Sequence, residues 1–291
     1  MLKYLMKLRH RKAFTLVELV IVMAILAVLM VSVAAFSTPV QQMIKATAAD
    51  ADALSANKIM GDYIENRLAY ADMVQLFYTA DSLNGSTDLE AAYTVYQQKL
   101  DPATNPDTSA ADFAGMLIFR FVEDTVEPSK SKYMMYDVNI PSSGGSFASA
   151  VGTSTNPKGA VFTDFFYDNS QNLFLFPTTA QTNVIKDCCY MTVDIVPYKF
   201  DPEETTDFIT STTLQSYYSE KLAHESDPAS NPSVSPTVEG FRGQRSGAQE
   251  SVTFEFKNIS PAKMPSKITY SNPGGDGGGS DIVIFYYIKK Y

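Results

Sequence analysis

The sequence predicts an α+β protein in which one long N-terminal helix precedes a head built on an antiparallel β-sheet. Three observations lead to this prediction. An apolar run occupies residues 14–36, a helix-periodic amphipathic pattern continues it to residue 82, and runs rich in β-branched and aromatic residues follow. We therefore expect four parts: a basic leader at 1–13, an apolar helix half at 14–36, an amphipathic helix half at 37–82, and a globular head at 83–291.

Composition and charge suit a membrane-attached protein with a solvated head. Of the 291 residues, 45% are hydrophobic, enough for a sizeable core. The leader holds five of the 23 basic residues and no acidic one, so the chain after Ala13 has 18 basic against 32 acidic residues, a net charge of −14. That balance opposes nonspecific binding to nucleic acid. The basic residues ahead of the apolar run place the leader in the cytoplasm and the rest of the chain outside.

The apolar run is long enough to cross a membrane, yet it contains one carboxylate. As a helix, residues 14–36 would span about 34 Å, against a hydrocarbon core of about 30 Å. The polar exceptions within it are Thr15, Glu18 and Ser32. A charge near the bilayer centre costs roughly 2.5–3.5 kcal/mol, and less toward an end of the span, so a charged residue in such a segment is a functional-site candidate. Glu18 therefore needs a partner.

Three interpretations compete for this N-terminal region. It could be a plain signal anchor, or a secretory signal peptide that is cleaved after Val33-Ala34-Ala35. The third interpretation rests on the junction ahead of the run, where a basic leader and the small residue Ala13 precede "FTLVELVIVMAILAVL". This stretch resembles the processing site of type IV prepilins and pseudopilins, with Phe14 as the first mature residue and Glu18 as the fifth. It departs from the family in having Ala13 where Gly is usual.

The resemblance implies a cleavage and a pairing. A membrane prepilin peptidase would cut between Ala13 and Phe14 and methylate the new amino group of Phe14, leaving the helix on the mature protein. The new amine has a reference pKa of about 7.7–8.0, and Glu18 lies one helical turn, about 6 Å, further along the axis. In a staggered bundle of helices, Glu18 of one subunit would face the amine of its neighbour. The alternative is that Glu18 lies at the level of the lipid headgroups.

Beyond the membrane run, a helical pattern is predicted to continue to a turn at Asn84-Gly85. Pro39 would kink this helix, and Ser37 or Thr38 could cap a new helical start. Gly61 would weaken its interior by up to about 1 kcal/mol relative to alanine. The apolar positions recur at steps of mostly three or four, and they are Val40, Ile44, Ala48, Ala53, Met60, Ile64, Leu68, Ala71, Val74 and Phe77.

A second helix and seven strands are predicted in the head. The helix, residues 86–100, has cap-forming residues at its start and stops before Asp101-Pro102. In the last strand, Ile282, Ile284, Tyr286 and Ile288 should share one face, and Val283, Phe285, Tyr287 and Lys289 the other. Asn169-Ser170 suggests a hairpin. The strand candidates are residues 114–124, 131–140, 159–168, 172–178, 187–200, 250–259 and 280–291.

Loops and cysteines carry weaker signals. Residues 226–249 are rich in Pro, Ser and Gly and residues 271–281 are rich in Gly, so both are expected to be mobile.

Cys188 and Cys189 are adjacent, so in a strand they would point to opposite faces as two unpaired thiols, one of them buried. A strained disulfide between them is the alternative. We expect no metal site, because the histidines His10 and His224 stand in no ligand spacing.

No catalytic motif is present, so we expect no enzymatic activity and no cofactor. The resemblance implies a type IV pilus subunit whose partners are other pilin subunits, the prepilin peptidase, the pilus assembly machinery and the membrane. It would be a single-pass membrane precursor and later part of a surface filament. A mature length of 278 residues favours a minor or tip subunit, with a large major pilin as the alternative. The rival functions are a pseudopilin of a type II secretion or DNA-uptake system, where nucleic acid would be a partner, and a membrane-anchored surface-binding protein that never polymerises.

Overall fold

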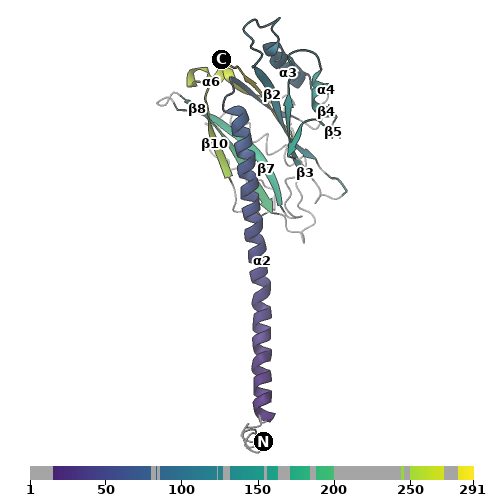
Figure 1. Ribbon diagram of the computed structural model, residues 1–291, viewed down its shortest axis with the longest axis vertical. Helices are drawn as coiled ribbons and strands as arrows, with labels where there is room; N and C mark the ends of the chain where they lie inside the picture. The colour runs from purple at the N-terminus through teal and green to yellow at the C-terminus, as the bar shows by residue number, and fades with distance from the viewer. Residues whose placement is uncertain are drawn as a thin grey trace, which may run out of the picture. The chain divides into compact units, whose positions relative to one another are not determined.

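The computed structural model describes residues 16–79, 83, 86–122, 124–126, 132–153, 156–162, 171–183, 188–199, 244–245, 250–271 and 281–291. The chain divides into two compact units, Met1–Ala49 and Asp50–Tyr291. The described part of the first unit is entirely helical, and the second unit is the globular head (Figure 1). The α+β, pilin-like arrangement predicted from the sequence is therefore confirmed.

The long helix α2 comprises Leu16–Leu68 and continues through Pro39, so no new helical start is needed after Ser37. It ends earlier than expected. Residues 37–82 were predicted to form its amphipathic half, but Met73–Thr79 is instead strand β1. The physical reason is long-range pairing: β1 lies between two other strands, and its apolar residues enter the cores on both faces of the sheet.

The main sheet contains six of the described strands, in the order β11-β1-β12-β2-β3-β6. All neighbouring pairs are antiparallel except β1 and β11, which are parallel. β11 was not among the predicted strands. The further bounds are β2 Phe113–Val122, β3 Lys132–Asn139, β6 Ala160–Phe162, β11 Ile268–Ser271 and β12 Asp281–Ile288.

Strand β12 has apolar residues buried on both of its faces, as its sequence predicted. Ile282, Ile284 and Tyr286 pack in the core that also contains the end of α2, with Ile288 at its border. Val283, Phe285 and Tyr287 pack in the opposite core. The main sheet is thus the middle layer of three, and its residues alternate between the two outer layers.

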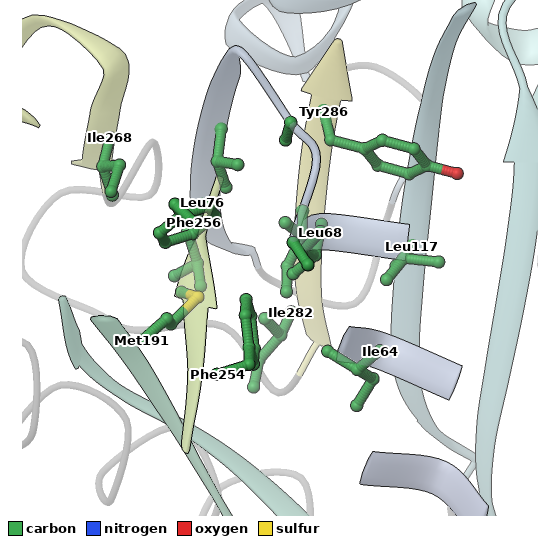
Figure 2. Packing of buried hydrophobic residues seen from close by; sticks show 14 of the residues in the cluster. Ile64, Leu68, Leu76, Leu117, Met191, Phe254, Phe256, Ile268, Ile282 and Tyr286 are labelled. Carbon is green, nitrogen blue, oxygen red and sulfur yellow. The ribbon is translucent and has the colours of Figure 1, made fainter. Parts of the chain in front are cut away.

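One outer layer is formed by the last turns of α2 and a second sheet. In that sheet β7 (Gln171–Asn183), β8 (Cys188–Lys199) and β10 (Glu250–Phe256) are antiparallel, and β9 (Gln244–Arg245) pairs with β8. Figure 2 shows Met191, Phe254 and Phe256 from this sheet beside Ile64 and Leu68 of α2. The core between them and the main sheet therefore joins three elements that are far apart in the sequence.

The other outer layer contains two helices. α3 (Thr87–Leu100) matches the predicted second helix, and the Ser86 side chain caps its start by accepting from the Leu89 backbone N–H. α4 (Phe147–Val151) begins with a reciprocal pair of hydrogen bonds between Ser146 and Ser149. The remaining elements are β4 Gly152–Thr153, β5 Asn156–Pro157, η2 Pro261–Lys263 and α6 Met264–Lys267.

Several predicted loops lie wholly or largely outside the described residues. Asn84-Gly85 and Asn169-Ser170 are not described, so those two turns stay predictions. Within 226–249 the structure describes 244–245, which form β9, and within 271–281 it describes the two end residues, which belong to β11 and β12.

Candidate functional site

The N-terminal part of α2 is the first candidate site because it exposes apolar side chains along its whole length. Leu16–Lys45 is long and apolar enough to cross a membrane, and none of it is buried within the structure. Leu16, Phe36 and Met43 have exposed fractions of 80%, 72% and 72%. A soluble helix with such a surface would associate or aggregate, so this segment is built for lipid or for other apolar helices.

The predicted processing site precedes this helix. Ala13 and Phe14 lie outside the described residues, and α2 begins two positions after Phe14. Glu18 is exposed and lies in the first turn of α2. A carboxylate is favoured there because the backbone N–H groups at a helix start carry partial positive charge. The role of Ala13, Phe14 and Glu18 in processing and assembly stays a prediction.

At its other end, α2 is fastened to the head by a polar cluster that the sequence did not predict. The Asp137 carboxylate of β3 forms an ion pair with Arg67, with 2.8 Å between Nη2 and Oδ2. It also accepts hydrogen bonds from the hydroxyls of Tyr63, at 2.5 Å, and Tyr286, at 3.2 Å. The Asp137 side chain is 5% exposed and that of Arg67 is 41% exposed. A buried carboxylate thus has a neutralising cation and two neutral donors.

The ionisation of these groups follows from their surroundings. Burial raises the pKa of the Tyr63 hydroxyl, and the hydrogen bond to Asp137 raises it further. Burial likewise raises the pKa of Tyr286, with the nearby Asp137 charge adding to the effect. The hydrogen bond to Tyr63 raises the pKa of Arg67. Both tyrosines therefore stay protonated at neutral pH and can act as donors to Asp137.

A glycine makes room for this cluster. Gly115 of β2 lies directly opposite Tyr286 in β12. A Cβ atom at position 115 would lie 2.6 Å from the Tyr286 hydroxyl oxygen and 2.7 Å from the ring carbon that carries it. The Tyr286 side chain therefore passes over Gly115 on its way to Asp137.

A second glycine, Gly61 of α2, allows α2 to approach Val252 of β10 closely, because a Cβ atom at position 61 would clash with a Val252 methyl group.

The two residues that directly follow strand β10 also cap the carboxyl end of α2. The Lys257 backbone N–H donates to the Ala69 carbonyl at 2.7 Å, and the Asn258 side-chain amide donates to the Tyr70 carbonyl at 2.7 Å. The chain then turns into β1, where the Asp72 backbone N–H donates to the Tyr287 carbonyl. Carbonyl groups at a helix end have no partner within the helix, so these donors satisfy acceptors that would otherwise depend on water.

The opposite core contains a buried ion pair between neighbouring strands. Arg120 of β2 and Asp281 of β12 approach to 3.5 Å, and both are buried. Burial raises the pKa of the nearby Tyr136 hydroxyl to about 12, an effect that the Arg120 charge reduces and the Asp281 charge increases. Such pairs hold a specific register because a shifted strand would leave each charge buried alone.

Cys188 and Cys189 are both buried, with exposed fractions of 5% and 0%. The expectation that one of the two would be buried is corrected accordingly. Cys189 packs in the core with Met191, two residues further along the same face of β8. Among the described residues, no group of three or more His, Cys, Asp or Glu side chains could hold a metal ion.

Comparisons with known proteins bear on the N-terminus. The model of the prokaryotic N-terminal methylation motif matches residues 8–34. No curated protein and no solved structure matches the chain. Residues 8–34 therefore carry the prepilin-type motif, which implies a type IV pilin-like protein that a prepilin peptidase processes. Proteins of this kind are typically non-enzymatic structural subunits, and the motif with its apolar helix suggests membrane insertion before assembly.

Proposed function

We propose that this chain is a subunit of a type IV pilus, cleaved before Phe14 and assembled into a surface filament through α2. The observation that carries the proposal is the methylation motif at residues 8–34 running directly into an exposed apolar helix. The same apolar surface would serve twice. It first holds the precursor in the membrane and then packs against the helices of other subunits.

Assembly would be guided by two charges at the start of the helix. Cleavage gives Phe14 a cationic amine, and N-methylation keeps its positive charge. In a staggered bundle, Glu18 of one subunit pairs with the amine of the next. An ion pair that is buried in an apolar bundle must be complete, because removing one partner leaves an uncompensated charge. The pair therefore fixes the axial offset between neighbouring subunits.

The polar cluster at the end of α2 supports this role. A filament subunit must transmit tension between its helix and its head. Arg67 and Tyr63 join α2 to β3, and the cap from Lys257 and Asn258 joins it to β10. The helix is thus fastened to both sheets of the head by directional bonds as well as by apolar packing.

The test is the variant Glu18→Gln, with Glu65→Gln as the matched control. Both residues are exposed glutamates of α2, but Glu65 lies in the head unit beyond the apolar segment. We expect Glu18→Gln to enter the membrane normally and to be strongly depleted from sheared filaments, since breaking a buried pair costs roughly 3–5 kcal/mol. Glu18→Asp should be intermediate, and Glu65→Gln should assemble normally. Wild-type amounts of Glu18→Gln in the filament fraction, at equal membrane pools, would reject the pairing.

Two alternatives remain distinguishable by the same fractionation. A pseudopilin would carry the same motif but would act in a secretion or DNA-uptake system, and its loss would abolish secretion or transformation rather than surface piliation. A surface protein that never polymerises would stay in the membrane fraction after shearing, whatever residue stands at position 18.

A further inference from the structure

Strand β12 comes after all the other described strands in the sequence, yet it lies in the middle of the main sheet. It pairs with β1 on one side and with β2 on the other, and it is antiparallel to both. The side chains of residues 281–287 are all buried. The centre of the head is therefore made of residues that become available only after every other described strand has been synthesised.

The absence of β12 would divide the main sheet in two. β1 and β2 would be separated by two strand spacings, about 10 Å, which is too far for backbone hydrogen bonds. Among the described strands, β1 would keep the four-residue strand β11 as its partner, and β2 would keep β3. Two strands are at most marginally stable in water, so neither part of the sheet is expected to persist without β12.

Both cores of the head would also lose side chains at their centre. Residues of β12 alternate between the core shared with α2 and the core shared with α3, and Ile284 and Phe285 are 1% and 0% exposed. The Phe285 ring packs edge-on against Phe77 of β1, with 5.7 Å between the ring centroids. The Tyr96 hydroxyl of α3 donates to the Phe285 carbonyl at 3.4 Å. The packing of α3 on the sheet therefore depends on β12 as well.

Two aspartates in equivalent positions hold the chain just after β12. Asp72 directly precedes β1 and accepts the backbone N–H of Lys289 at 2.6 Å. Asp112 directly precedes β2 and accepts the backbone N–H of Lys290 at 2.9 Å and the hydroxyl of Tyr287 at 3.0 Å. Burial alone would raise the pKa of Asp112, but these hydrogen bonds outweigh it, and the pKa lies below its ordinary value. Each neighbour of β12 thus begins with a carboxylate that binds the arriving chain.

The first residue of β12 supplies a charge to β2. Asp281 forms an ion pair with Arg120 at 3.5 Å, and both residues are buried. A head that collapsed without β12 would bury the Arg120 charge without this carboxylate, and breaking a buried pair in this way is strongly unfavourable. A compact head is therefore disfavoured until Asp281 is in place.

We infer that β12 is the closing strand of the head. The main sheet and the elements packed on its two faces reach their native arrangement only when residues 281–290 are available, and they then fold together with β12. Contacts between segments far apart in the sequence must form in the same step as the local ones, because neither part of the sheet is stable before them.

Folding in this order would keep the head unfolded while it crosses the membrane, a step that rests on the proposed function. In a precursor held by its apolar helix, the head crosses in the order of its sequence, so β12 crosses after all the other described strands. Until then the membrane is crossed by an unfolded chain rather than by a folded domain. The head would therefore fold on the outer side of the membrane, after β12 has arrived.

The test compares two isoleucines that lie in the same core on neighbours of β1. Ile284 belongs to β12 and pairs with Leu76, and Ile268 belongs to the end strand β11 and pairs with Val74. The mature protein in detergent is unfolded in urea and refolded, and near-UV circular dichroism follows the packing of its tyrosines. We expect Ile284→Ala to slow refolding at least fivefold and to change the unfolding rate less than twofold, because β12 contacts are present in the transition state.

The matched control Ile268→Ala should change refolding less than twofold and should mainly accelerate unfolding. Should Ile284→Ala fail to fold, Ile284→Val and Ile268→Val make the same comparison with a smaller change. A normal refolding rate with faster unfolding in the Ile284 variant would show that β12 docks after the rest has folded, which overturns the inference. Equal slowing of refolding by both substitutions would also overturn it.

A protease site introduced into residues 272–280 of the full-length protein tests the same dependence at equilibrium. Cutting the folded protein should leave residues 281–291 bound, because β12 is held by both neighbours. After unfolding in urea and removal of this fragment, the remaining chain should stay unfolded on dilution. A synthetic peptide of residues 281–291 should restore the near-UV signal. A native signal without the peptide would contradict the closing role of β12.

The two measurements require no filament, so their failure is distinguishable from failure of the proposed function. If the head folds without β12, the closing strand is wrong although the pilus proposal stands. If wild-type protein folds as expected here but never appears in sheared filaments, the pilus proposal fails and the folding order stands.

Discussion

Asp137 is the residue on which the attachment of α2 to the head depends most. It is nearly buried and has Arg67, Tyr63 and Tyr286 as partners from two other elements. Nothing in the sequence around position 137 distinguishes it from an ordinary polar residue in a strand. The spacing of Tyr63 and Arg67, four residues apart on a helix, indicates that they share a face but not what they contact. This part of the site was beyond sequence-based prediction because the partners are 70 residues or more apart.

Replacing Asp137 with asparagine should therefore destabilise the head. The variant keeps the shape and one acceptor, but it loses the ion pair and leaves Arg67 without its counter-charge. Because Arg67 is partly exposed, we expect a loss of about 1–3 kcal/mol in the free energy of unfolding rather than the larger cost of a fully buried pair. Denaturant unfolding of the isolated mature protein in detergent measures it. Tyr63→Phe, which removes one donor, should cost about 0.5–1.5 kcal/mol. An unchanged midpoint for Asp137→Asn would show that the cluster contributes nothing.

Gly115 is a second residue whose contact could not be predicted from the sequence, and here the contact depends on the absence of a single Cβ atom. The sequence shows a glycine within a strand, which predicts a bulge or a close approach without saying which. The structure identifies a close approach, because the Tyr286 side chain crosses it. We expect Gly115→Ala to cost about 1–3 kcal/mol by overpacking. The double variant Gly115→Ala with Tyr286→Leu should lose less than the sum of the two single changes. Simple additivity in the thermal unfolding data would contradict the contact.

The end of α2 at Leu68 lies earlier than the helical pattern of the sequence predicts. Ala71, Val74 and Phe77 continue the three-residue steps of the α2 stripe, so the helical pattern extended past Leu68. The same stretch is rich in residues that suit a strand, and pairing with β12 and β11 decides the outcome. The α3 helix was predictable to within one residue because its start and stop signals are local. β11 was missed because four residues with a parallel partner carry little periodicity of their own.

The two residues that cap α2 provide a prediction and its control, because Asn258 donates through its side chain and Lys257 through its backbone. Asn258→Ala removes the side-chain donor to the Tyr70 carbonyl, so we expect a loss of about 1 kcal/mol in head stability. Lys257→Ala should be nearly neutral, because Lys257 bonds to Ala69 through its backbone N–H and its side-chain ion pair with Glu255 is exposed. Equal effects of the two substitutions on the unfolding midpoint would argue against the cap.

The fold class of the whole molecule was predictable because the hydrophobic patterns of its successive segments are consistent with one another. The apolar run, the amphipathic continuation and the alternating strands all indicated a helix followed by a sheet-based head. The order of strands was not predictable, because β1, β12 and β2 are adjacent in the sheet although β12 comes last among the described strands. Long-range pairing of this kind is decided by packing on both faces of the sheet rather than by local patterns.

Buried tyrosines should make the whole head sensitive to alkaline pH. Burial raises the pKa of Tyr96, Tyr286 and Tyr287 well above the ordinary value of 10.0, and that of Tyr136 to about 12. Because these pKa values are higher in the folded state, their contribution to stability is fully present below about pH 10 and is lost as pH rises through the folded values. Absorbance at 295 nm should show exposed tyrosines ionising near pH 10 and the buried ones ionising only as the head unfolds. Titration of all 17 tyrosines in a single step near pH 10, with the head still folded, would contradict the burial.

If the chain is a processed pilin-like subunit, the N-terminus of the assembled protein will carry the mark of that processing. Mass spectrometry of the protein recovered from sheared filaments should identify N-methylated Phe14 as the first residue, with the 13-residue leader absent. Ala13 stands where the resembled family usually has glycine, so some uncleaved precursor in the membrane fraction is compatible with cleavage before Phe14. A mature protein that begins at Phe36 would contradict it, because that cleavage would remove Glu18 and the apolar segment through which the subunits are proposed to assemble.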